Sequence, residues 1–326
     1  MKRFAITMGD PCGIGAEIIV KALKSRRDYI DKSVIFGNAD IIKYYISLLN
    51  FDDILVHKMS SLDDVKDGFI NVYDSNPAAV EEIPIGKISK IGGECAFSYV
   101  CKAIKAVLDK KFSSVVTAPL NKEALHLAGH FYAGHTEIFA DLSGGDNFAM
   151  LLWSDKLKAI HVTTHIPLHN IFEVITKERI IKIVKLADET LKKLGYKIPR
   201  IAVAGINPHA GENGIFGNEE IEIVIPAVKE CLEMNINVRG PIAPDTVFLR
   251  ALKGEFDIVA AMYHDQGHIP IKLLAFDTGV NITVGLNIIR TSVDHGTAFD
   301  IAGKLEAKEQ SLIKAIEIAE KLSLRS

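Results

Sequence analysis

The stretch FAITMGDPCGIGAEIIVKAL, residues 4–23, indicates the fold class. It contains a short apolar strand, a turn rich in glycine and proline, and then a helical pattern. The same order recurs along the chain, and further apolar strands are expected at 33–36, 113–117, 158–163, 200–204 and 257–262. Continuous apolar strands that alternate with helices are typical of a mainly parallel sheet covered on both faces. We therefore expect an α/β protein.

The glycine-rich turn at 9–15 has a position that phosphate-binding loops also use, because it follows a strand and opens a helix. Its spacing does not match either common phosphate motif. Ile18 stands where the dinucleotide fingerprint requires Gly or Ala, and the Lys of a P-loop is missing. We interpret this stretch as a tight turn that packs the helix against the strand.

Length and composition set limits on the class of protein. The 326 residues correspond to about two domains. The net charge is −3, and no run of five like charges occurs, which argues against a nucleic-acid or membrane partner. No apolar stretch reaches the roughly 18 residues of a membrane span, and the apolar run at the N-terminus is too short for a signal peptide. Because the four cysteines form no C-x-x-C pair, we expect a reduced, cytoplasmic protein.

Three apolar strands lead directly to a histidine. His165 follows the strand at 158–163, His209 follows the strand at 200–204, and His264 follows the strand at 257–262. Ligands of parallel sheets bind beyond the carboxyl ends of the strands, and three imidazoles with an open position suit a catalytic divalent metal. The alternative is that they are three unrelated polar loop residues, and the pattern alone leaves both interpretations open.

Two further groups of polar residues suggest anion binding. His135 and Thr136 stand at an expected helix start, where free backbone N–H groups attract anions, although simple helix capping explains them equally well. Lys272, Asn281 and Arg290 lie amid apolar sequence, which suggests recognition of phosphate or carboxylate, or else solvated surface charges.

Two aspartates are candidates for proton transfer. Asp245 lies in a Pro-Asp-Thr turn, and Asp265 directly follows His264. An aspartate beside a metal ligand either orients that ligand or moves protons itself, and the sequence leaves this choice open.

Ten segments, in order along nearly the whole chain, resemble the 4-hydroxythreonine-4-phosphate dehydrogenase family. They are MGDPCGIGAEI (8–18), TAPLNKEAL (117–125), GHTE (134–137), TTHIPL (163–168), NPHAGE (207–212), PDT (244–246), YHDQG (263–267), GVNIT (279–283), IRTS (289–292) and DHGTAFDIAG (294–303).

The resemblance implies a fold like that of isocitrate and isopropylmalate dehydrogenases, with two α/β/α domains and the active site in the cleft between them. It places an NAD-side domain at 1–130 plus 270–326. It places a metal, substrate and dimerisation domain at 131–269. It also implies a homodimer in which the partner subunit completes the active site.

The family's functional residues fall on candidates that the sequence already offers. The resemblance implies metal ligands at His165, His209 and His264, with one divalent ion (Zn, Mg, Mn or Co) per site shared across the dimer interface. It implies substrate-binding roles for the following residues: His135, Thr136, Lys272, Asn281 and Arg290. The stretch 295–304 is similar to the adenosine-binding segment of the related dehydrogenases, so NAD contacts are expected at His295, Gly296 and Asp300.

The implied reaction is NAD-dependent oxidation at C3 and decarboxylation of a 4-phosphorylated 3-hydroxy acid, with Asp245 or Asp265 as the base. One branch of the family oxidises 4-hydroxy-L-threonine 4-phosphate for pyridoxal phosphate synthesis. A second branch converts D-threonate or D-erythronate 4-phosphate to dihydroxyacetone phosphate and CO2, and the runs at 121–130 and 264–272 favour it. Phosphate acyltransferases share the scaffold and need no metal, so the three histidines argue against that alternative.

Overall fold

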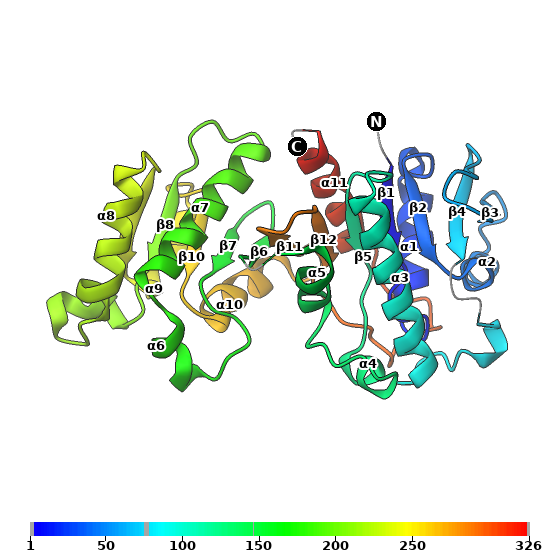
Figure 1. The fold of residues 1–326 in the computed structure, drawn as a ribbon, viewed down its shortest axis with the longest axis horizontal. Helices are drawn as coiled ribbons and strands as arrows, with labels where there is room; N and C mark the ends of the chain where they lie inside the picture. Colours follow the sequence, from blue (N-terminus) through cyan, green and yellow to red (C-terminus); the bar gives the residue numbers. More distant parts are fainter. Residues whose placement is uncertain (1–2, 75–77, 146, 325–326) are drawn as a thin grey trace. The chain divides into compact units, whose positions relative to one another are not determined.

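The computed structural model describes residues 3–74, 78–145 and 147–324 (Figure 1). It contains two compact units, one formed by Met1–Asp146 with Leu286–Leu324 and the other by Asn147–Gly285. Each unit is built from a β-sheet with helices on its two faces, so the expected α/β class is confirmed. Among the described helices, none combines the length and apolar content that crossing a membrane requires.

The first unit contains six parallel strands in the order β3-β4-β2-β1-β5-β12. Their bounds are Phe4–Thr7 (β1), Ser33–Gly37 (β2), Leu55–Met59 (β3), Phe69–Asp74 (β4), Val115–Thr117 (β5) and Arg290–Val293 (β12). Since the strands are parallel, the loops after their carboxyl ends lie at one edge of the sheet, where ligands of such sheets bind.

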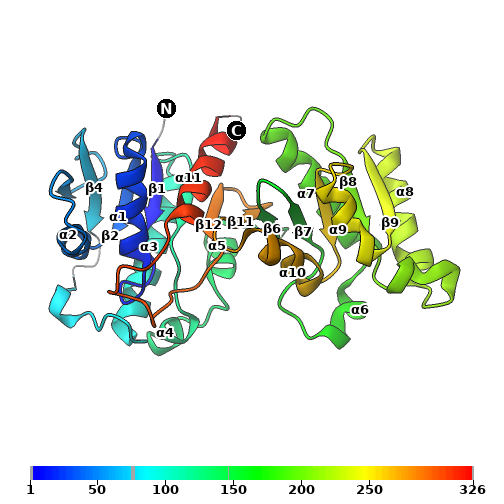
Figure 2. The same cartoon turned by 180° about the vertical axis from the view of Figure 1, so that it is seen from behind.

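Helices cover both faces of this sheet. Figures 1 and 2, seen from opposite sides, show α3 in front of one face and α1 with α11 in front of the other. The helices are Gly15–Ser25 (α1), Ala39–Leu48 (α2), Lys90–Leu108 (α3), Lys122–Leu127 (α4), His135–Ser143 (α5) and Gln310–Ser323 (α11). Helix α11 is amphipathic, and its buried side chains include Leu312, Ile316 and Leu322.

The turn after β1 is as tight as its glycines suggest. Gly9 has φ +70°, and a Cβ atom there would lie 2.1 Å from the carbonyl oxygen of Pro119. A Cβ atom on Gly15, the first residue of α1, would lie 2.0 Å from the carbonyl oxygen of Met8. Only glycine fits such close backbone approaches. The interpretation of this segment as a packing turn is confirmed.

The second unit contains six strands in the order β11-β6-β7-β10-β8-β9. Their bounds are Ala149–Trp153 (β6), Lys158–His161 (β7), Ile201–Ala204 (β8), Val238–Ile242 (β9), Ile258–Ala261 (β10) and Val280–Val284 (β11). Strands β7, β10, β8 and β9 are parallel, whereas β6 is antiparallel to both of its neighbours. The sequence pattern did not predict β6, β9 or β11 as strands.

Helices again cover both faces of the second sheet. Figures 1 and 2 show α7 in front of one face and α9 with α10 in front of the other. The helices are Ile171–Val174 (α6), Lys177–Lys193 (α7), Ile225–Glu233 (α8), Pro244–Leu252 (α9) and His264–Ala275 (α10). Val247 of α9 and Ile271 of α10 pack with Leu152 and Val259 of the sheet in one buried apolar cluster.

The boundaries between the units differ from those expected at 130/131 and 269/270, since the compact units divide at 146/147 and 285/286. Helix α5 packs against α3 and so belongs to the first unit. Helix α10 packs on β6 and β7, and β11 pairs with β6, so both belong to the second unit. Tertiary packing, which the motif pattern does not report, decides these boundaries.

Candidate active site

The three candidate metal ligands follow three adjacent strands of the second unit. His165 follows β7, His264 opens α10 directly after β10, and His209 follows β8. In the sheet β10 lies between β7 and β8, and all three strands are parallel. The carboxyl ends that carry these histidines are therefore at one edge of one sheet, as the sequence predicted.

Two of these histidines lie close together. The ring centroids of His165 and His264 are 5.6 Å apart. The Nδ1 atom of His264 lies 2.6 Å from Oδ1 of Asp265, which is the arrangement in which a carboxylate fixes the tautomer of an imidazole and leaves Nε2 as the ligand atom. A pocket of about 350 Å³ lies between these groups. Its lining residues are Thr164, His165, Ile166, Leu168, Ile171, Tyr263, His264 and Asp265.

Two more histidines lie behind His264. Its ring stacks on that of His268, with centroids 3.6 Å apart, and Nδ1 of His268 lies 3.2 Å from Nε2 of His161. His161 is fully buried and donates from Nδ1 to the carbonyl oxygen of Met150. Burial, reinforced by the neighbouring His268, lowers the pKa of His161 to about 3, so this ring is neutral.

His209 lies in an unusual backbone segment, Pro208–Gly214. All five residues from His209 to Asn213 have φ between +44° and +80°. Left-handed helical backbone costs roughly 1–2 kcal/mol for each residue that carries a Cβ atom. Such strain persists only where surrounding contacts enforce it, and it occurs often at functional sites. The segment presents the exposed His209 side chain beyond the end of β8.

The donor set fits a divalent metal, but one chain does not assemble it. Imidazole nitrogens suit Zn²⁺, Mn²⁺ or Co²⁺, and an adjacent carboxylate such as Asp265 is a common outer partner. Across residues 3–74, 78–145 and 147–324, no three His, Cys, Asp or Glu side chains lie close enough to hold one ion. The structure brings His165 and His264 together and does not bring His209 into the same group. The three-histidine metal site stays a prediction.

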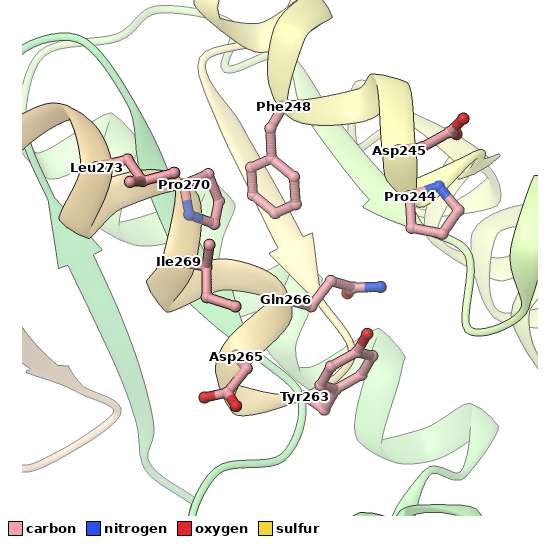
Figure 3. Close-up of a pocket in the computed structure, with 9 residues that line it drawn as sticks. All are labelled: Pro244, Asp245, Phe248, Tyr263, Asp265, Gln266, Ile269, Pro270 and Leu273. Atoms are coloured by element: carbon pink, nitrogen blue, oxygen red, sulfur yellow. The ribbon is translucent and has the colours of Figure 1, made fainter.

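The two candidate bases, Asp245 and Asp265, line a second pocket of about 430 Å³. Figure 3 shows them on opposite sides of it, with their carboxylates pointing away from one another. They do not form a carboxylate pair. The other lining residues are Pro244, Phe248, Tyr263, Gln266, Ile269, Pro270 and Leu273.

In the first unit, Arg290 forms the centre of a buried polar cluster. Its side chain is 3% exposed, and Nη2 donates to Oγ1 of Thr117 at 3.1 Å. Nη1 donates to Oγ1 of Thr136 at 3.4 Å, and the guanidinium lies over the ring of Phe139 at 5.4 Å. Burial lowers the pKa of the guanidinium, against the opposing effect of Glu137. An anionic ligand would compensate this buried cation.

The N-terminus of α5 adds anion donors to this cluster. Gly134 precedes the helix and makes no side-chain cap, which leaves backbone N–H groups at the helix start for a ligand. Within the described part of the chain, Nε2 of His135 is buried without a hydrogen-bond partner. Burial, followed by the charge of Arg290, holds the pKa of His135 well below its usual value. The structure thus brings together His135, Thr136 and Arg290, three of the five residues for which the resemblance implies substrate binding. Their binding role stays a prediction.

The other two predicted substrate residues lie in the second unit. Asn281 is on β11, and its Oδ1 is buried with no hydrogen-bond partner among the residues that the structure describes. Lys272 lies in the last turn of α10, half-buried, with its ammonium 5.6 Å from the ring of Phe276. Both side chains are half-buried, and the buried Oδ1 of Asn281 is an acceptor that a ligand would satisfy.

The predicted NAD residues follow β12 in the first unit. The carbonyl oxygen of Thr297 accepts a hydrogen bond from the backbone N–H of Ile14, so this segment adjoins the glycine-rich turn after β1. A Cβ atom on the exposed Gly296 would meet no described heavy atom within 4 Å, and Asp300 is exposed. Open backbone at Gly296 and the carboxylate of Asp300, a natural acceptor for ribose hydroxyls, fit a dinucleotide.

Sequence reasoning missed three residues of these clusters. Thr117 ends β5, and its place in TAPLNKEAL was the available signal. Gln266 lies within the dense turn at 263–268, where only the histidines and Asp265 attracted attention. Nothing in the sequence indicated a role for Glu220, because a carboxylate in an amphipathic helical pattern is expected at the surface.

Comparison with known proteins identifies the family. The model of the "Pyridoxal phosphate biosynthetic protein PdxA" family matches residues 29–319. The chain belongs to the PdxA family. It is 47% identical over 324 residues to the D-threonate 4-phosphate dehydrogenase of Salmonella typhimurium, which covers 99% of both chains. It is 44% identical over 323 residues to the 4-hydroxythreonine-4-phosphate dehydrogenase of Sulfurihydrogenibium sp., with 98% of both covered.

A solved PdxA-family structure has the same fold. The 4-hydroxythreonine-4-phosphate dehydrogenase from Klebsiella pneumoniae superimposes with a TM-score of 0.87 at 45% identity, covering 99% of this chain and 100% of that one. Relatives this similar over their full lengths are dehydrogenases, so this PdxA-family protein is an oxidoreductase. The acyltransferase alternative has no such support.

Proposed function

We propose that this PdxA-family protein catalyses the NAD- and divalent-metal-dependent oxidation at C3, and the decarboxylation, of a 4-phosphorylated 3-hydroxy acid. The observation that carries the proposal is the buried Arg290, held by Thr117 and Thr136 beside the uncapped start of α5. A guanidinium, a hydroxyl and free helix N–H groups together are the donors that a phosphate group uses.

We assign D-threonate or D-erythronate 4-phosphate as the substrate, with dihydroxyacetone phosphate and CO2 as products. The relative at 47% identity named for D-threonate 4-phosphate supports this choice. The relative at 44% identity named for 4-hydroxythreonine 4-phosphate makes 4-hydroxy-L-threonine 4-phosphate the alternative. These substrates share phosphate, C3 alcohol and carboxylate and differ at C2, so the anion site alone does not discriminate between them.

The chain's own residues supply binding and proton transfer. We assign phosphate binding to Arg290, Thr136 and the N–H groups of α5, and we assign Lys272 and Asn281 as further substrate-binding residues. We assign proton removal from the C3 hydroxyl to Asp245, because Asp265 is already engaged by His264. Oxidation at C3 gives a β-keto acid, which loses CO2 readily.

His165, His209 and His264 would hold the metal, with Asp265 orienting His264. A bound divalent ion lowers the pKa of a substrate hydroxyl and stabilises negative charge that develops on its oxygen. His295, Gly296 and Asp300 would bind NAD, which accepts the hydride from C3.

We further propose a homodimer in which two copies complete one active site. The described residues of a single chain do not assemble a three-ligand metal site, which supports a contribution from a second copy. Helix α10, which begins at His264, also leaves Ile269, Leu273 and Phe276 exposed at 56%, 82% and 68%. Apolar side chains this exposed suit burial against another copy.

The substrate assay follows directly. Incubation with NAD, Mn²⁺ and each of the three phosphorylated acids in turn should release NADH and CO2 with the threonate or erythronate substrate. Reaction with 4-hydroxy-L-threonine 4-phosphate alone would transfer the protein to the alternative branch. Absence of NADH with all three acids would contradict the proposed reaction.

Oligomeric state tests the shared site. Analytical ultracentrifugation over a dilution series should show a dimer, and Mn²⁺ should shift dissociation to lower protein concentration, because a ligand that bridges two copies stabilises the dimer. A His209→Ala variant should lose this metal dependence. A chain that stays monomeric at all concentrations and still binds Mn²⁺ tightly would overturn the shared site.

A further inference from the structure

We propose that Glu220 is a positioning residue that holds the left-handed turn at 208–214 and so fixes His209 for metal binding. The proposal rests on the ligand role of His209 proposed above. It adds a residue with no assigned role, at the start of a π-helical turn, Glu220–Val224, which leads into α8.

The carboxylate of Glu220 bonds to the chain just before the turn. Its Oε1 accepts from the backbone N–H groups of Ile206 at 2.7 Å and Asn207 at 2.8 Å. Its Oε2 accepts from Nδ2 of Asn207 at 2.9 Å. Three N–H donors therefore compensate a carboxylate that is only 1% exposed. Together they set the direction in which the chain leaves β8.

Two glycines allow the carboxylate to reach this place. A Cβ atom on Gly205 would lie 3.3 Å from Oε1 of Glu220, and one on Gly211 would lie 2.7 Å from Oε2. The carboxylate thus packs against the backbone on both sides of His209. Since the backbone from His209 to Asn213 is left-handed and strained, a fixed contact of this kind is what keeps it from relaxing.

A second bridge connects this turn to the strand that leads to His264. The side chain of Gln266 accepts from the backbone N–H of Met262 at 2.6 Å through Oε1 and donates to the carbonyl oxygen of Gly205 at 2.9 Å through Nε2. The ends of β8 and β10 are therefore joined by one amide. Glu220 holds the turn relative to Gly205, and Gln266 holds Gly205 relative to the His264 segment.

Glu220 faces backbone N–H groups and is buried, so it is a positioning residue and not a catalytic one. A role limited to overall stability would lower the unfolding temperature but leave the folded chain's metal affinity intact. The positioning role predicts lower metal affinity and faster amide exchange in residues 205–216 of a chain that is still folded. These two readouts separate the two roles.

The experiment uses the full-length chain and three variants. Glu220→Ala removes all three accepted hydrogen bonds. Glu220→Gln keeps an oxygen for Ile206 and Asn207 but turns an NH2 group toward Nδ2 of Asn207. Glu222→Gln is the matched control, because it makes the same charge change at an exposed position two residues away. Circular dichroism establishes that each variant is folded.

The first readout is Mn²⁺ affinity by calorimetry, with His209→Ala as reference. We expect Glu220→Ala to weaken binding by about 10- to 100-fold, as loss of an outer-shell partner does, and Glu220→Gln to be intermediate. The Glu222→Gln control should match the wild-type chain. Wild-type affinity in a folded Glu220→Ala variant would overturn the positioning role.

The second readout is hydrogen–deuterium exchange without metal. We expect exchange in 205–216 to rise about tenfold in Glu220→Ala, while the β10 segment at 258–261 stays protected. Unchanged exchange in 205–216 would also overturn the proposal. Should the wild-type chain bind no Mn²⁺, the proposed metal function and the role of Glu220 toward it both fail, and exchange alone then reports whether Glu220 holds the turn.

Discussion

The Nδ1 atom of His264 lies 2.6 Å from Oδ1 of Asp265, the next residue in the chain. The two residues are the first two of α10. Such a contact favours the proton on Nδ1 and leaves the Nε2 lone pair available. The proposed function therefore gives Asp265 the orientation of His264 and gives proton removal to Asp245.

Asp265→Asn tests this division of roles. The amide keeps the shape of the side chain but removes the negative charge that makes the imidazole more basic. We expect Mn²⁺ affinity to fall by about 10- to 100-fold. Asp245→Asn is the comparison, and it should lower kcat by about 100-fold or more with little change in Mn²⁺ affinity. Equal loss of metal affinity in both variants would contradict the assignment.

Arg290→Met tests the anion site through affinity and through stability. The buried guanidinium donates to the hydroxyls of Thr117 and Thr136 and lies over the face of Phe139, and the charge of Glu137 also acts on it. We expect the variant to raise KM for the phosphorylated acid by about 10- to 150-fold, since a charged contact to phosphate contributes about 1.5–3 kcal/mol. Inorganic phosphate should raise the Tm of the wild-type chain more than that of the variant, because the guanidinium is a proposed phosphate ligand. An equal rise in both chains would contradict the anion site.

The strand-end histidines show what sequence reasoning resolves. The apolar runs before His165, His209 and His264 predicted three parallel strands, and the structure contains them side by side as β7, β10 and β8. The period of apolar residues and the ligand rule for parallel sheets were sufficient, because both are local properties of the chain. His135, Thr136 and Arg290, which the structure places in one cluster, came from two separate polar groups of the sequence, and only the family resemblance gave them one role.

The supporting residues were beyond that reasoning for a physical reason. Glu220 acts through the backbone of Ile206 and Asn207, residues of any type, so its partner leaves no mark in the sequence. The left-handed turn is also hidden, because only Gly211 and Asn213 among residues 209–213 are types that often adopt positive φ. The boundaries of the compact units are hidden in the same way, since they depend on which unit α5 and α10 pack against.

Gly211→Ala tests how tightly the left-handed turn is packed. Gly211 has φ +80°, and an added Cβ would lie 2.7 Å from Oε2 of Glu220. Gly254→Ala is the matched control, because Gly254 has φ +83° and a Cβ there meets no described heavy atom within 4 Å. We expect the control to lose about 1 kcal/mol in the free energy of unfolding and Gly211→Ala to lose about 2–4 kcal/mol. Equal losses for both variants in urea unfolding would show that the Glu220 carboxylate moves aside without loss of stability.

Asp10 gives the chain a pH-dependent cost that substitution should remove. Its carboxylate is fully buried, with Oδ1 accepting from the backbone N–H of Cys12, and among the described residues Oδ2 has no hydrogen-bond partner. Burial raises the pKa of Asp10 from 3.8 to about 6, against the lowering effect of Cys12. A raised pKa in the folded chain means that the folded state binds the proton more tightly than the unfolded state does. This group's contribution to stability therefore falls as pH rises from about 4 to 6.

Asp10→Asn keeps the acceptor for Cys12 and removes the buried charge. The variant should gain stability above pH 6, up to about 3 kcal/mol from the difference between the folded and unfolded pKa values, and gain little at pH 4, where the wild-type carboxyl is already largely protonated when folded. Unfolding midpoints at pH 4.5 and pH 8 test this, with the exposed Asp109→Asn as control. A gain of the same size at both pH values would mean that packing around the turn after β1, and not the charge of Asp10, limits stability there.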